Sequence, residues 1–142
     1  MPLIGQKDAE FLQKEFADKL VDPVHLVMFT QEFECQYCRE TRELVQEIAD
    51  LSDKIDAEVY NFVTDKEKTD EYNVDKVPAI AVIGAKDYGV RFFGIPSGYE
   101  FTSLIEDIIA VSEGDSGLSA PTREAVAQIT KPVHIQVFIT PT

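Results

Sequence analysis

The residues of this sequence with the clearest capacity for chemistry are its two cysteines, Cys35 and Cys38, in the run Cys-Gln-Tyr-Cys. Two thiols at this spacing suit thiol–disulfide exchange, in which a thiolate attacks a disulfide and a second thiol resolves the mixed disulfide. A helix N-terminus favours this chemistry, because its free amides and its dipole stabilise a thiolate. The spacing places both cysteines on one face of a helix that begins near residue 36.

Two other interpretations of the cysteine pair remain open at this point. One C-x-x-C supplies two of the usual four zinc ligands, so the pair could be half of a metal site that another chain completes. Neither His25 nor His134 lies near the cysteines in the sequence. The pair could also be two inert thiols. We favour disulfide exchange and expect no metal site within the chain itself.

The apolar pattern predicts the elements that position the cysteines. Apolar side chains that recur every four residues predict a helix over residues 7–20. The apolar run Val24–Phe29 predicts a strand that is buried on both faces. A helix from about residue 36 to about residue 54 follows, and then a strand over residues 57–63. Two short strands around such a helix predict a right-handed, parallel βαβ unit.

In the rest of the first 111 residues, the sequence pattern predicts a short helix, a hairpin and a longer helix. The short helix extends to Tyr72, and Val77-Pro78 then interrupts the chain before a third strand over Ala79–Ile83. A turn bounded by glycines leads to a fourth strand over Val90–Phe93, antiparallel to the third. Apolar residues at helical spacing predict a final helix from residue 101 to about residue 111. The fold class is therefore α/β, with a central mixed four-stranded sheet flanked by helices.

A short internal repeat divides the chain. Pro23-Val24-His25 recurs 109 residues later as Pro132-Val133-His134, each time after a helix and at the start of a strand. We interpret the repeat as a duplication. Residues 1–111 then form one complete unit, the small and polar residues 112–120 form a linker, and residues 121–142 form the opening of a truncated second unit.

That opening is expected to consist of an extra C-terminal helix and strand. The helix extends from Pro121 to about residue 129, and the strand spans Val133–Ile139, where apolar side chains alternate. A strand without neighbours exposes its backbone amides and carbonyls and therefore invites pairing with another chain. We expect a homodimer in which residues 133–139 of two chains pair or exchange.

Composition and charge exclude several classes of function. Hydrophobic residues make up 44% of the chain and charged residues 27%, as in ordinary globular proteins. The net charge of −13 repels phosphate backbones, so we expect no nucleic-acid partner. The chain lacks an apolar run long enough for a membrane span, and charges interrupt its first twenty residues. We therefore expect no membrane association and a cytoplasmic location.

Several motifs together resemble a known family. ECQYC after a strand, Val77-Pro78 before the third strand and Gly94 after the fourth form the skeleton of the thioredoxin and glutaredoxin superfamily. The chain is more narrowly similar to the glutaredoxin-like protein disulfide oxidoreductases of thermophilic archaea and bacteria, which carry two thioredoxin-like units. The resemblance covers essentially all 142 residues, aligned to the first unit and the start of the second. The shared stretches also include HLVMF, LVQEIADL, DKVPAI, YGVRFFGIPSGYEF and VFITPT.

The resemblance implies a thioredoxin-like fold and a role for each residue of the site. Cys35 would be the attacking cysteine and Cys38 the resolving cysteine. Pro78 would be in cis, next to the disulfide, so that the backbone of Val77 can pair with an extended substrate segment. Tyr37, Val77 and Pro78 would then bind the substrate.

Two departures from the wider superfamily affect the expected chemistry. The strand Val24–Phe29 lacks the buried carboxylate that thioredoxins use as a proton shuttle, and Glu32 is our candidate to replace it through water. Glutaredoxins bind glutathione through a basic residue before the first cysteine and a paired-glycine turn after the fourth strand. Gln31 and Gly94–Gly98 stand in those regions here, which weakens the expectation of glutathione recognition.

We therefore predict a thiol–disulfide oxidoreductase that exchanges protein disulfides through Cys35 and Cys38 and needs no cofactor beyond this pair. Its expected partners are protein disulfide substrates and a flavin-dependent disulfide reductase. An electron relay from a flavin disulfide reductase to a peroxidase is the alternative within redox chemistry. A metal-bridged or structural interaction module is the alternative from a different class.

Overall fold

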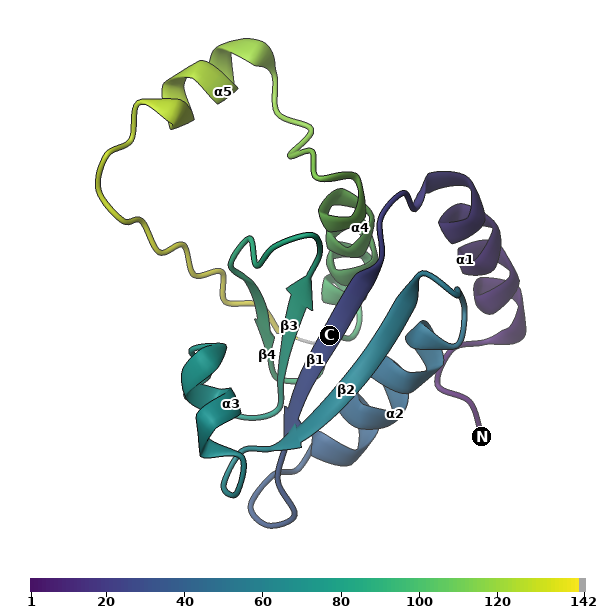
Figure 1. Ribbon diagram of the computed structural model, residues 1–142. Coiled ribbons are helices and arrows are strands. Elements are labelled where there is room, and N and C mark those ends of the chain that lie inside the picture. Colours follow the sequence, from purple (N-terminus) through teal and green to yellow (C-terminus); the bar gives the residue numbers. More distant parts are fainter. Residues whose placement is uncertain (141–142) are drawn as a thin grey trace.

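A four-stranded sheet in the order β2-β1-β3-β4 forms the centre of the computed structural model, which describes residues 1–140 (Figure 1). In chain order the helices and strands are α1 (Gln6–Lys19), β1 (Val24–Thr30), α2 (Cys38–Ala49), β2 (Ile55–Asn61), α3 (Lys66–Glu71), β3 (Ala79–Ile83), β4 (Val90–Phe93), α4 (Tyr99–Glu113) and α5 (Ala120–Ala127).

The sheet is mixed, as the sequence predicted. β1 pairs in parallel with β2, with Val24 opposite Ile55, and α2 makes the crossover between these two strands. β1 also pairs antiparallel with β3, with Phe29 opposite Ala79, and β3 pairs antiparallel with β4. The C-terminal end of β1 therefore lies beside the start of β3. The βαβ unit and the hairpin of the sequence analysis are both confirmed.

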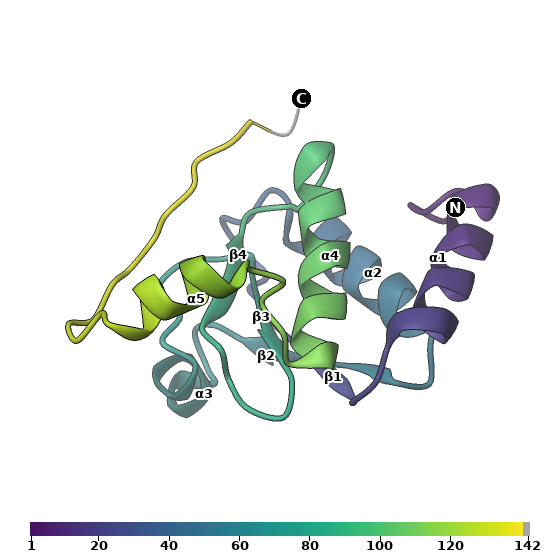
Figure 2. The same ribbon diagram turned by 90° about the horizontal axis from the view of Figure 1, so that it is seen from above.

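The two faces of the sheet are covered unequally. Figure 2 shows α1, α2 and α4 on one side of the sheet, where Phe16, Leu26, Ile48 and Ile108 belong to one large apolar cluster. A smaller cluster around Phe29 lies on the other face, near α3. Each fully buried side chain of this size contributes about 1.5–3 kcal/mol to folding before ordering costs. The large cluster therefore holds α2, and with it the cysteines, against β1.

The serine near the end of α4 ties this helix to the segment that enters β1. Ser112 is completely buried, and its Oγ accepts a hydrogen bond from the Val21 amide at 2.8 Å. The same hydroxyl donates to the Asp22 carbonyl at 2.7 Å. The helix continues to Glu113, two residues beyond the predicted end, because Ser112 is part of the packed unit. In the sequence analysis Ser112 was the first residue of the linker.

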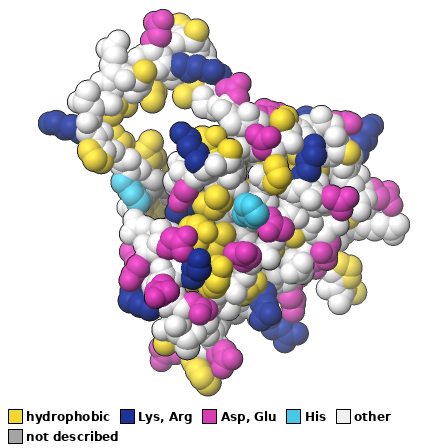
Figure 3. Space-filling view, viewed as in Figure 1, with side chains coloured by type: hydrophobic (Ala, Val, Ile, Leu, Met, Phe, Trp, Pro, Cys, Tyr) yellow, Lys and Arg dark blue, Asp and Glu magenta, His cyan; other side chains and the backbone are white. Residues whose placement is uncertain are grey.

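The C-terminal arm, residues 114–140, leaves the end of α4 and forms an open loop that includes α5 (Figure 1). The predicted extra helix is present as α5, but it has no buried residue. The predicted strand over Val133–Ile139 is wrong, because this segment is extended chain that belongs to no strand of the described sheet. Figure 3 shows an opening between the arm and the rest of the molecule. Residues 141–142 of the predicted second-unit segment lie outside the described residues.

The arm exposes its apolar side chains. Ile135 is 82% exposed, Val137 80% and Phe138 87%. Alternation of apolar and polar residues shows which side chains a strand would bury, but a strand forms only beside a partner. No other part of the described chain provides that partner. The side chain of His25 in β1 is exposed, and its Nδ1 atom lies 2.5 Å from a carboxylate oxygen of Asp56.

Loss of the Ser112 hydroxyl should destabilise the domain. Ser112→Ala leaves the buried groups that it bonds without their partner, so we expect the free energy of unfolding to fall by about 2 kcal/mol. Ser103→Ala is the matched control, because Ser103 lies on the exposed side of α4 and should change stability by less than about 0.5 kcal/mol. Urea unfolding of both variants measures this difference, and equal midpoints would contradict the assigned role of Ser112.

Candidate functional site

The cysteine pair lies where β1 passes into α2, in the loop at the lower end of the sheet in Figure 1. β1 ends at Thr30, Tyr37 precedes the first turn of α2, and Cys38 is the first helical residue. A parallel crossover requires the helix to begin near the C-terminal end of the strand that precedes it. This requirement places Cys35 in front of the first turn of α2, close to the free amides of the helix N-terminus.

Cys35 and Cys38 are joined by a disulfide, with their Cα atoms 5.5 Å apart. The two sulfur-bearing residues differ in exposure, because Cys38 is only 3% exposed whereas Cys35 is partly accessible. Cys38 is the buried first residue of α2, and Cys35 lies in the loop that precedes this helix. The structure therefore presents one cysteine to an incoming molecule and shields the other.

Polar contacts on both sides of Cys35 hold the loop in shape. The Gln31 side-chain amide donates to the Phe33 carbonyl at 2.6 Å, and Glu34 has a left-handed backbone with φ 55°. On the helix side, the buried Thr41 donates from its hydroxyl to the Tyr37 carbonyl at 2.7 Å. No motif in the sequence marks Thr41, although it lies one helical turn after Tyr37.

A groove of about 530 Å³ opens beside the disulfide, between the end of β1, the first turns of α2 and the end of β2. Of the residues predicted for the site, Cys35, Cys38 and Glu32 lie in this groove, and Glu32 is exposed on its wall. The other lining residues are Thr30, Gln31, Arg39, Arg42, Val59, Tyr60, Asn61 and Asp65.

Two of the ionisable groups in the groove already have partners. The Arg39 guanidinium pairs with Glu43 at 3.0 Å. The Tyr60 hydroxyl donates to Glu58 at 2.8 Å, and this hydrogen bond raises the pKa of Tyr60, so the ring stays neutral. Arg42 is exposed, and within the described residues it forms no ion pair. Arg42 follows Cys38 by four residues, but no motif in the sequence marks it.

The predicted substrate-binding residues lie around the groove but do not line it. The Val77–Pro78 peptide bond is cis, immediately before β3. The Pro78 carbonyl accepts a hydrogen bond from the Gly94 amide at 2.9 Å, and Val77 packs on the cluster around Phe29. Because the start of β3 lies beside the end of β1, these residues share one end of the sheet with the cysteines. Tyr37, between the cysteines, is 44% exposed.

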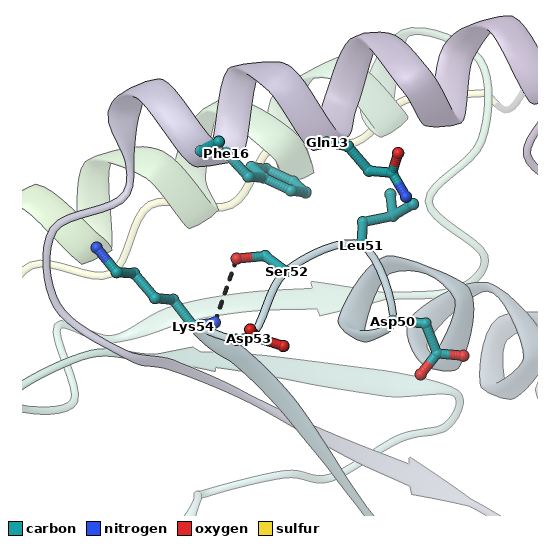
Figure 4. Close-up of a pocket in the computed structure, with 8 residues that line it drawn as sticks. Gln13, Phe16, Asp50, Leu51, Ser52, Asp53 and Lys54 are labelled. Atoms are coloured by element: carbon teal, nitrogen blue, oxygen red, sulfur yellow. Dashed lines mark hydrogen bonds between the residues drawn. The ribbon is translucent and has the colours of Figure 1, made fainter.

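A second groove, of about 360 Å³, lies between α1 and the turn that leads into β2 (Figure 4). Phe16 and Leu51 line it together with polar residues, but it contains no cysteine. The Lys54 amide donates to the Ser52 hydroxyl at 3.2 Å, and the Lys54 ammonium donates to the Leu20 carbonyl at 2.9 Å. The Lys54 contacts join the turn to the end of α1, so Ser52 and Lys54 have a structural role in this groove.

The described residues contain no group of three or more side chains that could hold a metal ion. No helix in this part of the chain is long and apolar enough to cross a membrane.

Comparison with known proteins gives a consistent picture. A family model for the thioredoxin domain matches residues 26–106. A probable thioredoxin from Methanothermobacter thermautotrophicus is 40% identical over 85 residues, which are 59% of this chain and 94% of that protein. An alkyl hydroperoxide reductase component from Pseudomonas aeruginosa is 30% identical over 125 residues, which are 88% of this chain and 22% of that protein.

Solved structures extend the similarity to the whole chain. A protein disulfide oxidoreductase from Aeropyrum pernix matches with a TM-score of 0.89 and 30% identity, over 99% of this chain and 62% of that chain. An N-terminal domain of the alkylhydroperoxide reductase AhpF from Enterococcus faecalis matches with a TM-score of 0.76 and 27% identity, over 86% of this chain and 59% of that chain. This chain thus spans about three fifths of each of these two solved chains.

These findings confirm the resemblance on which the sequence analysis relied. The thioredoxin-like fold is present, and the C-x-x-C cysteines form a disulfide at the start of α2, as in a thioredoxin-fold protein disulfide oxidoreductase. The chain therefore belongs to the thioredoxin family.

Proposed function

We propose that this domain exchanges protein disulfides, with Cys35 as the attacking cysteine and Cys38 as the resolving cysteine. The observation that carries this assignment is the unequal exposure of the pair, since Cys35 is accessible and Cys38 is 3% exposed. The attacking sulfur must meet a second molecule, whereas the resolving sulfur needs to reach only its neighbour.

Each turn of the cycle moves two electrons. The Cys35 thiolate attacks one sulfur of the substrate disulfide, forms a mixed disulfide and releases the first substrate thiolate, which takes up a proton. The Cys38 thiolate then attacks the Cys35 sulfur, re-forms the Cys35–Cys38 disulfide and releases the second substrate thiol. The substrate is reduced and the domain is oxidised. A separate reductant must then restore the dithiol, which is the domain's only redox group in this proposal.

Tyr37, Val77 and Pro78 are the proposed contacts for a protein substrate. The backbone beside Val77 provides an edge along which an extended segment can pair, and the exposed ring of Tyr37 offers apolar surface next to the disulfide. Glu32 is the proposed proton carrier, and its presence on the wall of the cysteine groove supports this role. Its exposure means that it would act through water.

An electron relay is the second candidate function. The similarity to AhpF proteins favours it, because the described fold matches an N-terminal domain of one such reductase over 86% of this chain. In this proposal a flavin-dependent disulfide reductase reduces the Cys35–Cys38 disulfide, and the dithiol passes its electrons to a peroxidase. Both functions use the same chemistry and differ in the final acceptor. We place the domain in the cytoplasm, where nicotinamide cofactors supply such reductases with electrons.

We further propose the domain boundaries that the repeat indicates. Residues 1–111 form the redox unit, residues 112–120 a linker, and residues 121–142 the opening of a second unit. The match to the longer Aeropyrum chain supports this division, because it includes the arm. We also propose a homodimer through residues 133–139, because the exposed apolar side chains of this segment gain stability when a second copy buries them.

Serine variants test the proposed cycle. With dithiothreitol as the reductant and insulin as the substrate, Cys35→Ser should abolish reduction, because no thiolate can attack. Cys38→Ser should accumulate a mixed disulfide with insulin, since the intermediate then has no intramolecular exit. Non-reducing electrophoresis detects this adduct, and the variant that lacks both cysteines is the control. Turnover of Cys38→Ser at the parent rate would contradict the dithiol mechanism.

Alkylation of the reduced protein tests the roles independently. Iodoacetamide at neutral pH should modify Cys35 first, because this residue is partly accessible and lies at the helix N-terminus, whereas Cys38 is buried. Glu32 and Glu34 oppose thiolate formation by charge repulsion, but solvent screens these exposed carboxylates. Fragmentation mass spectrometry of the peptide that contains both cysteines locates the label. Preferential labelling of Cys38 would reverse the assignment.

Light scattering tests the homodimer. The 142-residue chain should scatter as a dimer, and Val137→Asp should scatter as a monomer, because a charge cannot be buried without a partner. Val63→Asp is the matched control, since Val63 is also exposed but lies outside the arm, and this variant should remain a dimer. A parent chain that stays monomeric at high concentration would refute the proposal.

A further inference from the structure

The groove beside the disulfide holds an arginine, Arg42, that the proposed exchange of protein disulfides does not use. The chain has four arginines, and Arg39, Arg91 and Arg123 each form an ion pair with a carboxylate. Arg42 is the exception, because it forms no ion pair within residues 1–140. In a chain with a net charge of −13, an unpaired arginine next to the redox disulfide needs an explanation.

The position of Arg42 directs it toward the cysteines. It follows Cys38 by four residues in α2, so the two residues lie one helical turn apart on the same face. Side chains of a helix lean toward its N-terminus, which is the end that carries the disulfide. Arg42, Cys35 and Cys38 all line the same groove. A molecule that reacts at Cys35 can therefore reach the Arg42 guanidinium.

The groove also has acidic groups, and only one of them is free. Asp65 accepts a hydrogen bond from the Asn61 amide at 2.7 Å. Glu32 lines the groove and is exposed, and it forms no ion pair or hydrogen bond within the described residues. One unpaired cation and one unpaired anion thus face the same space. This arrangement matches a ligand that carries one charge of each sign.

We propose that this groove binds small disulfides of the amino-acid type, in which an α-carboxylate and an α-ammonium group lie close to the sulfur. Arg42 binds the carboxylate, and Glu32 attracts the ammonium group. The proposal rests on the proposed exchange function, and it adds a second substrate class at the same cysteine pair. The groove volume of about 530 Å³ lies within the range of about 300–1,000 Å³ that is usual for small-molecule sites.

Reduction of such a substrate, RSSR, needs no reactant other than the Cys35–Cys38 dithiol. The Cys35 thiolate attacks one sulfur, the S–S bond of RSSR breaks, and one RS⁻ leaves and takes up a proton. The Cys38 thiolate then attacks the Cys35 sulfur and releases the second RS⁻, which is also protonated. Two electrons pass from the dithiol to RSSR, and the products are the Cys35–Cys38 disulfide and two molecules of RSH.

Four disulfides separate the contribution of each charge. Cystine carries both groups, dithiodipropionate only the carboxylates, and cystamine only the ammonium groups. Insulin is the protein substrate, which we place at the Val77 side of the disulfide. Oxidation of the fully reduced protein by each disulfide is followed by mass spectrometry in a single turnover, so the assay needs no reductase.

The test compares the parent chain with Arg42→Gln. The variant should oxidise about fivefold more slowly with subsaturating cystine and with dithiodipropionate, because it loses a charge-assisted hydrogen bond to the carboxylate. Rates with cystamine and insulin should not change. Arg123→Gln removes an arginine from α5 and should leave all four rates unchanged.

Other results would contradict specific parts of the two proposals. An unchanged rate of Arg42→Gln with cystine, or an equal decrease with all four disulfides, would overturn the role of Arg42. A Glu32→Gln variant that slows oxidation by cystine no more than oxidation by dithiodipropionate would overturn the role of Glu32 in attracting the ammonium group. Failure of the parent protein to react with insulin, while cystine still reacts in an Arg42-dependent manner, would reject exchange with proteins and leave the small-disulfide site in place.

Discussion

The structure depends on the burial of β1, in which His25 is the one exposed residue. This strand pairs with β2 on one edge and with β3 on the other, and its side chains enter apolar clusters on both faces of the sheet. Because both edges of β1 are paired, an exposed loop can adjoin this strand only at its two ends. The parallel partner β2 requires a crossover, so the chain must turn into α2 at the C-terminal end of β1. The site of the cysteines is thus a consequence of how β1 is paired.

Local signals in the sequence predicted the parts of the fold that depend on neighbouring residues. The C-x-x-C and its helix are of this kind, and so is the buried run Val24–Phe29. The second strand was predicted two residues late, because its bounds depend on the pairing of Ile55 with Val24 rather than on its own composition. The strand over residues 133–139 failed for the same reason, since it has no partner in the described sheet. Arg42 was overlooked because its significance depends on which carboxylates are absent around it.

Ion pairs neutralise several of the cations on an otherwise acidic surface. Acidic side chains are spread over the face that Figure 3 shows, as expected for a net charge of −13. Several lysines and arginines are occupied by acidic neighbours one helical turn away, such as Lys66 with Asp70. Exposed pairs of this kind add little to stability, but they neutralise the cation. Arg42 has no such pair in the part of the chain that the structure describes, so its charge remains available to a molecule that binds beside the disulfide.

The disulfide closes a ring of only four residues, from Cys35 to Cys38. Cross-links stabilise a fold mainly by restricting the unfolded chain, and the restriction grows with the length of the closed loop. A ring this small restricts the unfolded chain little, whereas the apolar clusters on both faces of the sheet are independent of it. The apolar clusters can therefore hold the fold together while the cysteine pair alternates between its two oxidation states.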